Sequence, residues 1–286
     1  MGQTPSSSAA IQLLQELEKA TSKGSINNVR SFNLGNKTII LVGERHEQVP
    51  LGEKPLFVDF LRRLDCTEVV DVFVEDNHYF REDYRFKRIS QEEADAEAAQ
   101  SDAPMSRDSL VSVRRQAKVN KCDDKIRTHA VDVRDNGYQQ LDTETGRKLN
   151  EREVRAYALT LLYTELEGVV RMVHSSARKS EYAAAITGFM RNWARSIGRA
   201  CEHILDKLGP GASEEVVNQM NQVLFQAHSE LVDIYTFARM LRRDNSDLLI
   251  FYGGSNHADR LYKGFLVEFK HELKNVREHI YRPNHY

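Results

Sequence analysis

Two glycine-x-x-histidine patterns in the sequence each follow a run of apolar and β-branched residues directly. The first is Gly-Glu-Arg-His at 43–46, and the second is Gly-Ser-Asn-His at 254–257. Glycine suits this place, because a missing Cβ lets the backbone turn sharply and lets a ligand come close. Each histidine would then sit on the turn after its strand. Two such imidazoles could share a divalent metal, or one could act as general base to a water molecule with no metal.

Charged residues follow other predicted strands at the same kind of position. Glu75 ends the run FVE and Arg134 follows VDV, while Glu44 lies inside the first pattern. A carboxylate there would serve as acid, base or metal ligand, and a guanidinium would stabilise an oxyanion or hold a substrate carboxylate. The candidate catalytic residues are His46, His257, Glu44, Glu75 and Arg134. The candidate ligands of a divalent metal (Mn, Co or Zn) are His46, His257 and Glu75.

Structural roles explain several other polar residues near the strand ends. Residues 76–78, Asp-Asn-His, have the composition of a turn. His129, inside a predicted strand, is interpreted as a packed core histidine. A lone glycine-x-x-histidine pattern also occurs by chance, and a polar residue after a strand often caps the next helix. The repeated context is what favours function for His46 and His257.

Four short segments bounded by turn residues have the β-branched and apolar composition of buried parallel strands. They are residues 37–42, 69–75, 127–133 and 247–252. Helical spacing of apolar residues in 53–65 predicts a helix between the first two strands, and 106–121 can supply a second crossover helix. A strand–helix–strand unit makes its strands parallel, and the carboxyl ends of parallel strands form the ligand-binding edge of open α/β sheets. The charged residues would therefore gather at one edge.

The region before the last strand has a different character. Residues 150–174 and 180–208, and the stretch from Ser213 to Arg243, predict three long helices. The acidic segment 90–104 is almost free of large apolar residues and is expected to be a flexible loop. The last residues, 275–286, are expected to add an edge strand.

These elements predict an α/β fold with a mainly parallel sheet core and a large all-helical insertion before the last core strand. The predicted organisation is a leader and N-terminal helix at 1–30, a core formed by 31–149 and 245–286, and a helical insertion at 150–244.

Composition limits the classes of partner and the location. The 286 residues are 41% apolar and 29% charged with a net charge of −2, so no overall field attracts nucleic acid. Three widely spaced cysteines and the lack of a long apolar run favour a reduced, cytoplasmic setting. The start MGQTPS fits the pattern for myristoylation of Gly2, which would give weak membrane association, whereas simple removal of Met1 would leave a free Gly2.

With these motifs in place, the chain resembles the Tiki/TraB superfamily, which includes the erythromycin esterases and the ChaN-like proteins. The likeness lies in the paired glycine-x-x-histidine motifs at the first and last core strands, with Glu75 after the second strand and Arg134 between. It covers the strand ends and the order of elements, and it does not cover residues 150–244. The stretches DIYTFARM and IFYGGSNH are also similar to uncharacterised proteins of large DNA viruses, for which the location would be host cytoplasm or virion.

The resemblance implies hydrolysis of a peptide, ester or lactone, with or without metal. It implies that His46 and His257 are catalytic or metal-binding, that Glu44 and Glu75 are acid/base or ligand residues, and that Arg134 is the electrostatic group. The residues Ala258-Asp259-Arg260 after the second motif depart from the apolar segment expected there. A metallophosphoesterase is excluded, since its D-x-H and G-D-x-x-D motifs are missing from the sequence. A catalytically silent virion or host-interaction protein on the same fold remains the alternative.

Overall fold

The computed structural model describes the elements on which the candidate site depends. It describes residues 8–22, 26–44, 56–63, 69–77, 90–100, 116, 119, 125–132, 181–207, 211–242 and 245–280. The predicted helix at 150–174, nearly all of that at 106–121, and Gly2 lie outside these residues. The chain divides into two compact units. One contains residues 1–77, 81–132 and 243–286, and the other contains 78–80 and 133–242.

The first unit contains a six-stranded sheet with the strand order β4-β3-β5-β2-β1-β6. The strands are β1 (Asn28–Leu34), β2 (Lys37–Glu44), β3 (Val70–Asn77), β4 (Ile126–Asp132), β5 (Leu248–Gly254) and β6 (Leu273–Ile280). All four strands predicted from the sequence lie in this sheet, and the predicted edge strand is β6. The pairs β3–β4, β3–β5 and β2–β5 are parallel, and β1 is antiparallel to both β2 and β6. The predicted α/β class is confirmed.

Strand β1 was not predicted, because its sequence NVRSFNL lacks a clear apolar run. A two-residue turn at Gly35 and Asn36 joins it to β2, and Gly35 has a φ of 60°. Glycine adopts this left-handed conformation without a Cβ clash, and a glycine-asparagine pair between two strands is a hairpin signal. The hairpin brings Asn28, the first residue of β1, opposite Gly43 near the end of β2.

One face of the sheet packs against α1 (Ser8–Ser22) and α2 (Leu56–Arg63), both in predicted helical segments. Leu13 and Leu17 of α1 join a buried cluster with Val42, Val74 and other strand residues. On α2, the ring of Phe57 stacks on the ring of Tyr252 from β5, with 4.5 Å between the ring centroids. Burial of these apolar side chains is the main force that holds the two helices on this face.

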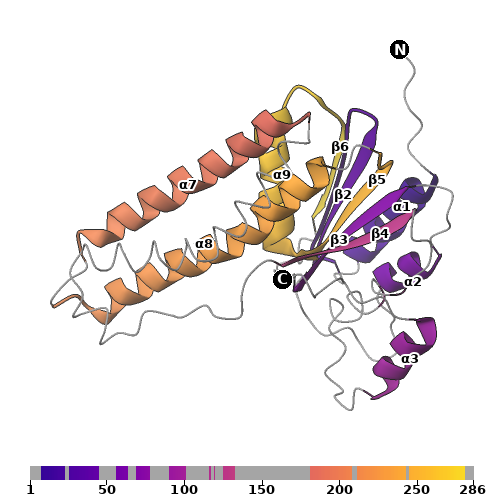
Figure 1. Ribbon diagram of the computed structural model, residues 1–286, viewed down its shortest axis with the longest axis horizontal. Helices are drawn as coiled ribbons and strands as arrows, with labels where there is room; N and C mark the ends of the chain where they lie inside the picture. Colours follow the sequence, from indigo (N-terminus) through magenta and orange to yellow (C-terminus); the bar gives the residue numbers. More distant parts are fainter. Residues whose placement is uncertain are drawn as a thin grey trace. The chain divides into compact units, whose positions relative to one another are not determined.

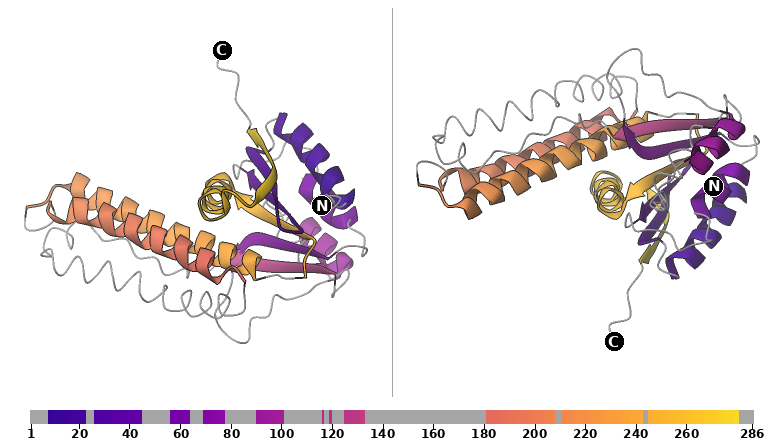
Figure 2. Two further views of the ribbon diagram at one scale, coloured as in Figure 1. Left: turned by 90° about the horizontal axis from the view of Figure 1, so that it is seen from above. Right: turned by 90° about the horizontal axis from the view of Figure 1, so that it is seen from below.

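The other face of the sheet is covered by α9 (Ser255–Phe269), which the sequence analysis did not identify as a helix. Figure 2 shows α9 across the sheet from α1 and α2. The ring of Phe265 lies 5.0 Å from that of Phe32 in β1, centroid to centroid. Asp259 forms an ion pair with Arg30. Asp259, one of the residues that depart from the expected apolar segment after the second motif, therefore links α9 to β1.

Residues Gln91–Gln100 form helix α3, so the prediction of a flexible loop over 90–104 is wrong for this part. The Ser90 hydroxyl accepts a hydrogen bond from the Glu93 backbone N–H (3.1 Å), and the Glu93 carboxylate accepts one from the Ser90 N–H (2.7 Å). This reciprocal capping box satisfies backbone donors at the helix start. Four alanines follow within the helix, and alanine has the highest helix propensity.

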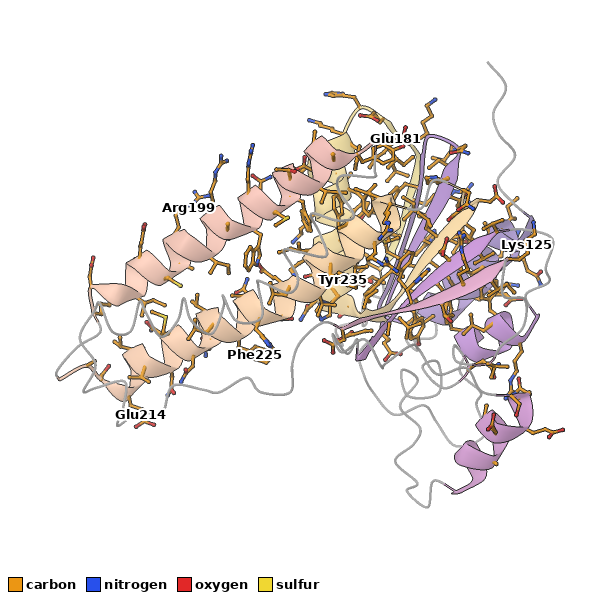
Figure 3. The ribbon with its side chains drawn as sticks, in the orientation of Figure 1. Lys125, Glu181, Arg199, Glu214, Phe225 and Tyr235 are labelled. Atoms are coloured by element: carbon orange, nitrogen blue, oxygen red, sulfur yellow. The ribbon has the colours of Figure 1, made fainter. Side chains whose placement is uncertain are left out.

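The second unit contains α7 (Ala183–Leu205) and α8 (Glu214–Leu241), which confirm two of the three long predicted helices (Figure 1). The rings of Phe189 and Phe237 pack between them at 4.4 Å. The Ser213 hydroxyl caps α8 by accepting a hydrogen bond from the Val216 N–H (3.4 Å). Figure 3 labels Tyr235 on α8. No helix in the described part of the chain combines the length and the apolar character needed to span a membrane.

Candidate functional site

Glu44 and Glu75, which the sequence analysis grouped together, extend from opposite faces of the sheet. In the register, Tyr252 of β5 is paired with Val42 on one side and with Val74 on the other. Glu44 is two residues after Val42, whereas Glu75 is one residue after Val74. Because side chains alternate along a strand, Glu44 faces α1 and α2, and Glu75 faces α9.

Glu75 and His257 are brought together at the carboxyl edge of the sheet. The Nε2 atom of His257 is 3.4 Å from Oε1 of Glu75, and both residues are only 5% exposed. The other carboxylate oxygen of Glu75 accepts a hydrogen bond of 2.7 Å from the Gly254 backbone N–H. Gly254 is the N-cap of α9, so the positive end of the helix dipole faces this carboxylate. The Gly254 N–H therefore orients one oxygen of the Glu75 carboxylate, and His257 lies beside the other.

Two glycines make this close packing possible. A Cβ on Gly253 would lie 2.9 Å from Oε2 and 3.0 Å from Cβ of Glu75. A Cβ on Gly43 would lie 2.7 Å from the Cα of Ser255 and still closer to the side chain of Asn28. Gly43, which the sequence analysis assigned to close ligand approach, is thus surrounded by contacts within the protein, whereas Gly253 was not part of the predicted motif. They allow the start of α9 and the Glu75 side chain to lie directly on the strand ends.

His257 belongs to the first turn of α9, not to a turn outside regular structure as the sequence analysis expected. Its second ring nitrogen, Nδ1, lies 3.0 Å from a terminal guanidinium nitrogen of Arg260. Arg260 was absent from the predicted site. The signal that could have identified it is its spacing, because residues three apart on a helix lie on one face.

On the opposite face, the Tyr252 hydroxyl donates a hydrogen bond of 2.6 Å to the Glu44 carboxylate. Both residues are buried, with 1% of Glu44 and 2% of Tyr252 exposed. Sequence reasoning missed Tyr252. In the strand register Gly254 is paired with Glu44, so Tyr252, two residues before Gly254, lies on the same face of the sheet as Glu44. This pair fixes the carboxyl end of β2 to β5.

The remaining predicted site residues cannot be placed. His46 and Arg134 lie outside the described residues. Their roles, and the meeting of His46 with His257, stay predictions.

A second ionic cluster lies at the amino ends of β3 and β4, near Lys125, which Figure 3 labels. The buried Asp71 carboxylate accepts hydrogen bonds from Arg127 (3.0 Å to Nε), from His129 (2.6 Å to Nε2) and from the Ser246 hydroxyl. Burial raises the pKa of Asp71, but the hydrogen bonds from His129 and Arg127 outweigh it, and the pKa is lowered to about 2. Several hydrogen-bond donors therefore stabilise the buried Asp71 carboxylate in its charged form.

Among the described residues, no group of three His, Cys, Asp or Glu side chains is arranged to hold a metal ion. The predicted metal set includes His46, so this observation does not test it. Comparison with protein-family models, with curated proteins and with solved structures found no match. The resemblance to the Tiki/TraB superfamily therefore stays a prediction.

Proposed function

We propose that the chain is a hydrolase of the Tiki/TraB, erythromycin esterase and ChaN-like type, acting on a peptide, ester or lactone. The proposed architecture is a mainly parallel core, with residues 150–244 as a helical insertion before β5. The observation that carries the proposal is the contact of Glu75 with His257, 3.4 Å from Oε1 to Nε2, at the carboxyl edge of the sheet. Ligands of open α/β sheets bind beyond this edge.

The proposed chemistry centres on the Glu75 carboxylate. The Gly254 N–H holds one of its oxygens at 2.7 Å, and His257 faces the other. A carboxylate held by a backbone N–H, with an imidazole beside it, can take a proton from a water molecule that attacks a carbonyl carbon. In the proposed mechanism Arg134 stabilises the resulting oxyanion, and His46 supplies the second proton-transfer group.

Glu44 has a different part in this proposal. Its carboxylate accepts the Tyr252 hydroxyl on the face covered by α2, while Glu75 lies on the face covered by α9. The sheet itself separates the two groups. We therefore assign Glu44 to positioning the end of β2, which leads directly into the first glycine-x-x-histidine motif.

The test is hydrolysis by the purified full chain of an aryl ester, a lactone and a fluorogenic peptide. Replacing His257 by Ala should lower the rate on the accepted substrate about 100-fold, because the Glu75 base loses the side chain that positions it and a misplaced catalytic group can cost this much. His279→Ala is the matched control, because His279 is a histidine of β6 that pairs at 2.9 Å with Glu18 of α1. Equal rates in both variants and the wild type would reject the proposal.

One observation favours the alternative of a catalytically silent interaction protein. Glu75 and His257 are each 5% exposed, so protein atoms already surround the pair. In a silent protein, none of the three substrate classes would be hydrolysed above the background rate. His257→Ala would then lower the free energy of unfolding by about 2 kcal/mol or more, as loss of a buried hydrogen-bonded side chain does.

A further inference from the structure

The side chain of Arg260 lies against the ring of His257 on α9. Its guanidinium nitrogen lies 3.0 Å from Nδ1 of the ring, one helical turn earlier on α9. A guanidinium group has only donors, so Nδ1 is the acceptor in this hydrogen bond and carries no proton. The proton of the neutral ring is then on Nε2, the nitrogen that faces Glu75 at 3.4 Å.

This arrangement does not fit the predicted metal ligand set. A neutral histidine that binds a metal through Nε2 carries its proton on Nδ1 and donates it to a carboxylate, a carbonyl or water. Arg260 offers no acceptor to such a proton. Binding through Nδ1 would require displacing the guanidinium, and a divalent cation would meet its positive charge at short range.

We propose that Arg260 is a positioning residue that fixes His257 as the Nε2–H tautomer and so keeps the Glu75–His257 pair free of metal. The proton on Nε2 is directed at Glu75, which is left as the basic member of the pair. This inference deepens the proposed hydrolase and rests on it for the catalytic role. The tautomer is measured without any substrate, so the two proposals can fail separately.

The first test is nitrogen-15 NMR of histidine side chains in the full chain at neutral pH. The spectrum of His257→Gln identifies the signals of His257 among the ten histidines. In the wild type, the Nε2–H form should exceed the Nδ1–H form at least about tenfold, as expected for a hydrogen bond from a charged donor. A ring with its proton mainly on Nδ1 would overturn the proposal.

The second test adds Zn²⁺ as a probe while the same ring signals are observed. They should stay unchanged in the wild type and in Lys263→Gln, a control that removes an exposed charge from the same helix. In Arg260→Gln, the side-chain carbonyl can accept a proton from Nδ1, so Zn²⁺ should shift the signals of His257. A shift in the wild type, or none in Arg260→Gln, would show that Arg260 does not keep metal from this histidine.

Discussion

Strand β3 carries a buried acid near each end, and both acids face a histidine. At the amino end, Asp71 is fully buried and accepts hydrogen bonds from Arg127, His129 and Ser246. At the carboxyl end, Glu75 accepts one short hydrogen bond from the Gly254 N–H, and His257 stands 3.4 Å away. A carboxylate held by several strong donors is a poor base, because its charge is already stabilised. On the proposed function, Asp71 serves stability and Glu75 serves catalysis.

The largest expected effect on stability comes from Asp71→Asn. Removing the carboxylate leaves the guanidinium of Arg127 without its ion partner inside the fold, and breaking a buried pair in this way costs about 3–5 kcal/mol. Urea unfolding followed by circular dichroism measures the change. The hydrolysis rate per folded molecule should not change. A selective loss of that rate would contradict the view that Asp71 serves stability and Glu75 serves catalysis.

Acidic pH should lower the stability that the cluster around Asp71 gives to the fold. The pKa of Asp71 is lowered from 3.8 to about 2 in the fold, so its carboxylate stabilises the protein fully above about pH 4. This contribution, about 2 kcal/mol, is lost as the pH falls towards about 2, where the folded state also takes up the proton. Urea unfolding at about pH 5 and about pH 2 should show the loss in the wild type. Asp71→Asn should lack this part of the pH dependence.

Gly253→Ala tests the packing at the Glu75 end. The new Cβ would lie 2.7 Å from the ring of Phe251 and 2.9 Å from the Glu75 carboxylate, so both side chains must move. We expect a loss of about 1–3 kcal/mol in the free energy of unfolding, together with lower activity. Gly198→Ala in α7 is the matched control. Beyond the helix's own backbone, no atom of the described residues lies within 4 Å of its added Cβ, so it should stabilise the protein by about 0.5–1 kcal/mol.

The smallest effect is expected from Ser90→Ala, at a polar contact away from both ends of β3. It removes the hydroxyl that accepts the Glu93 N–H and should destabilise the start of α3 by about 1 kcal/mol. Hydrogen exchange of the first-turn amides of α3 should become about fivefold faster. Unchanged exchange would mean that the capping box does not hold this helix.

Local composition predicted the central strands and the helices α2, α7 and α8, because each has an apolar period that fits only one element. The same approach failed for α3, where a capping box and alanines act without large apolar residues. It also failed for the polar strand β1, which is held in the sheet by backbone hydrogen bonds to β2 and β6. In both cases the decisive contacts are backbone hydrogen bonds and caps, which apolar periodicity does not report.

The candidate site was predicted in part. The sequence indicated that Glu75 and His257 follow strands, and the structure places them in contact. The sequence did not indicate that Glu44 and Glu75 lie on opposite faces of the sheet, because this depends on the register of β2 and β3 against Tyr252, which neither strand encodes alone. Arg260 was missed because its role depends on the orientation of the His257 ring.

The central claim, that the Glu75 carboxylate is the general base, is tested most directly by Glu75→Gln. Glutamine keeps the size of the side chain and an acceptor for the Gly254 N–H, so the free energy of unfolding should change by less than about 1 kcal/mol. Glutamine has no basic carboxylate, so kcat/KM on the accepted ester, lactone or peptide should fall at least about 100-fold. An unchanged kcat/KM, with a loss of several kcal/mol in stability, would contradict the account and make Glu75 a second structural acid like Asp71.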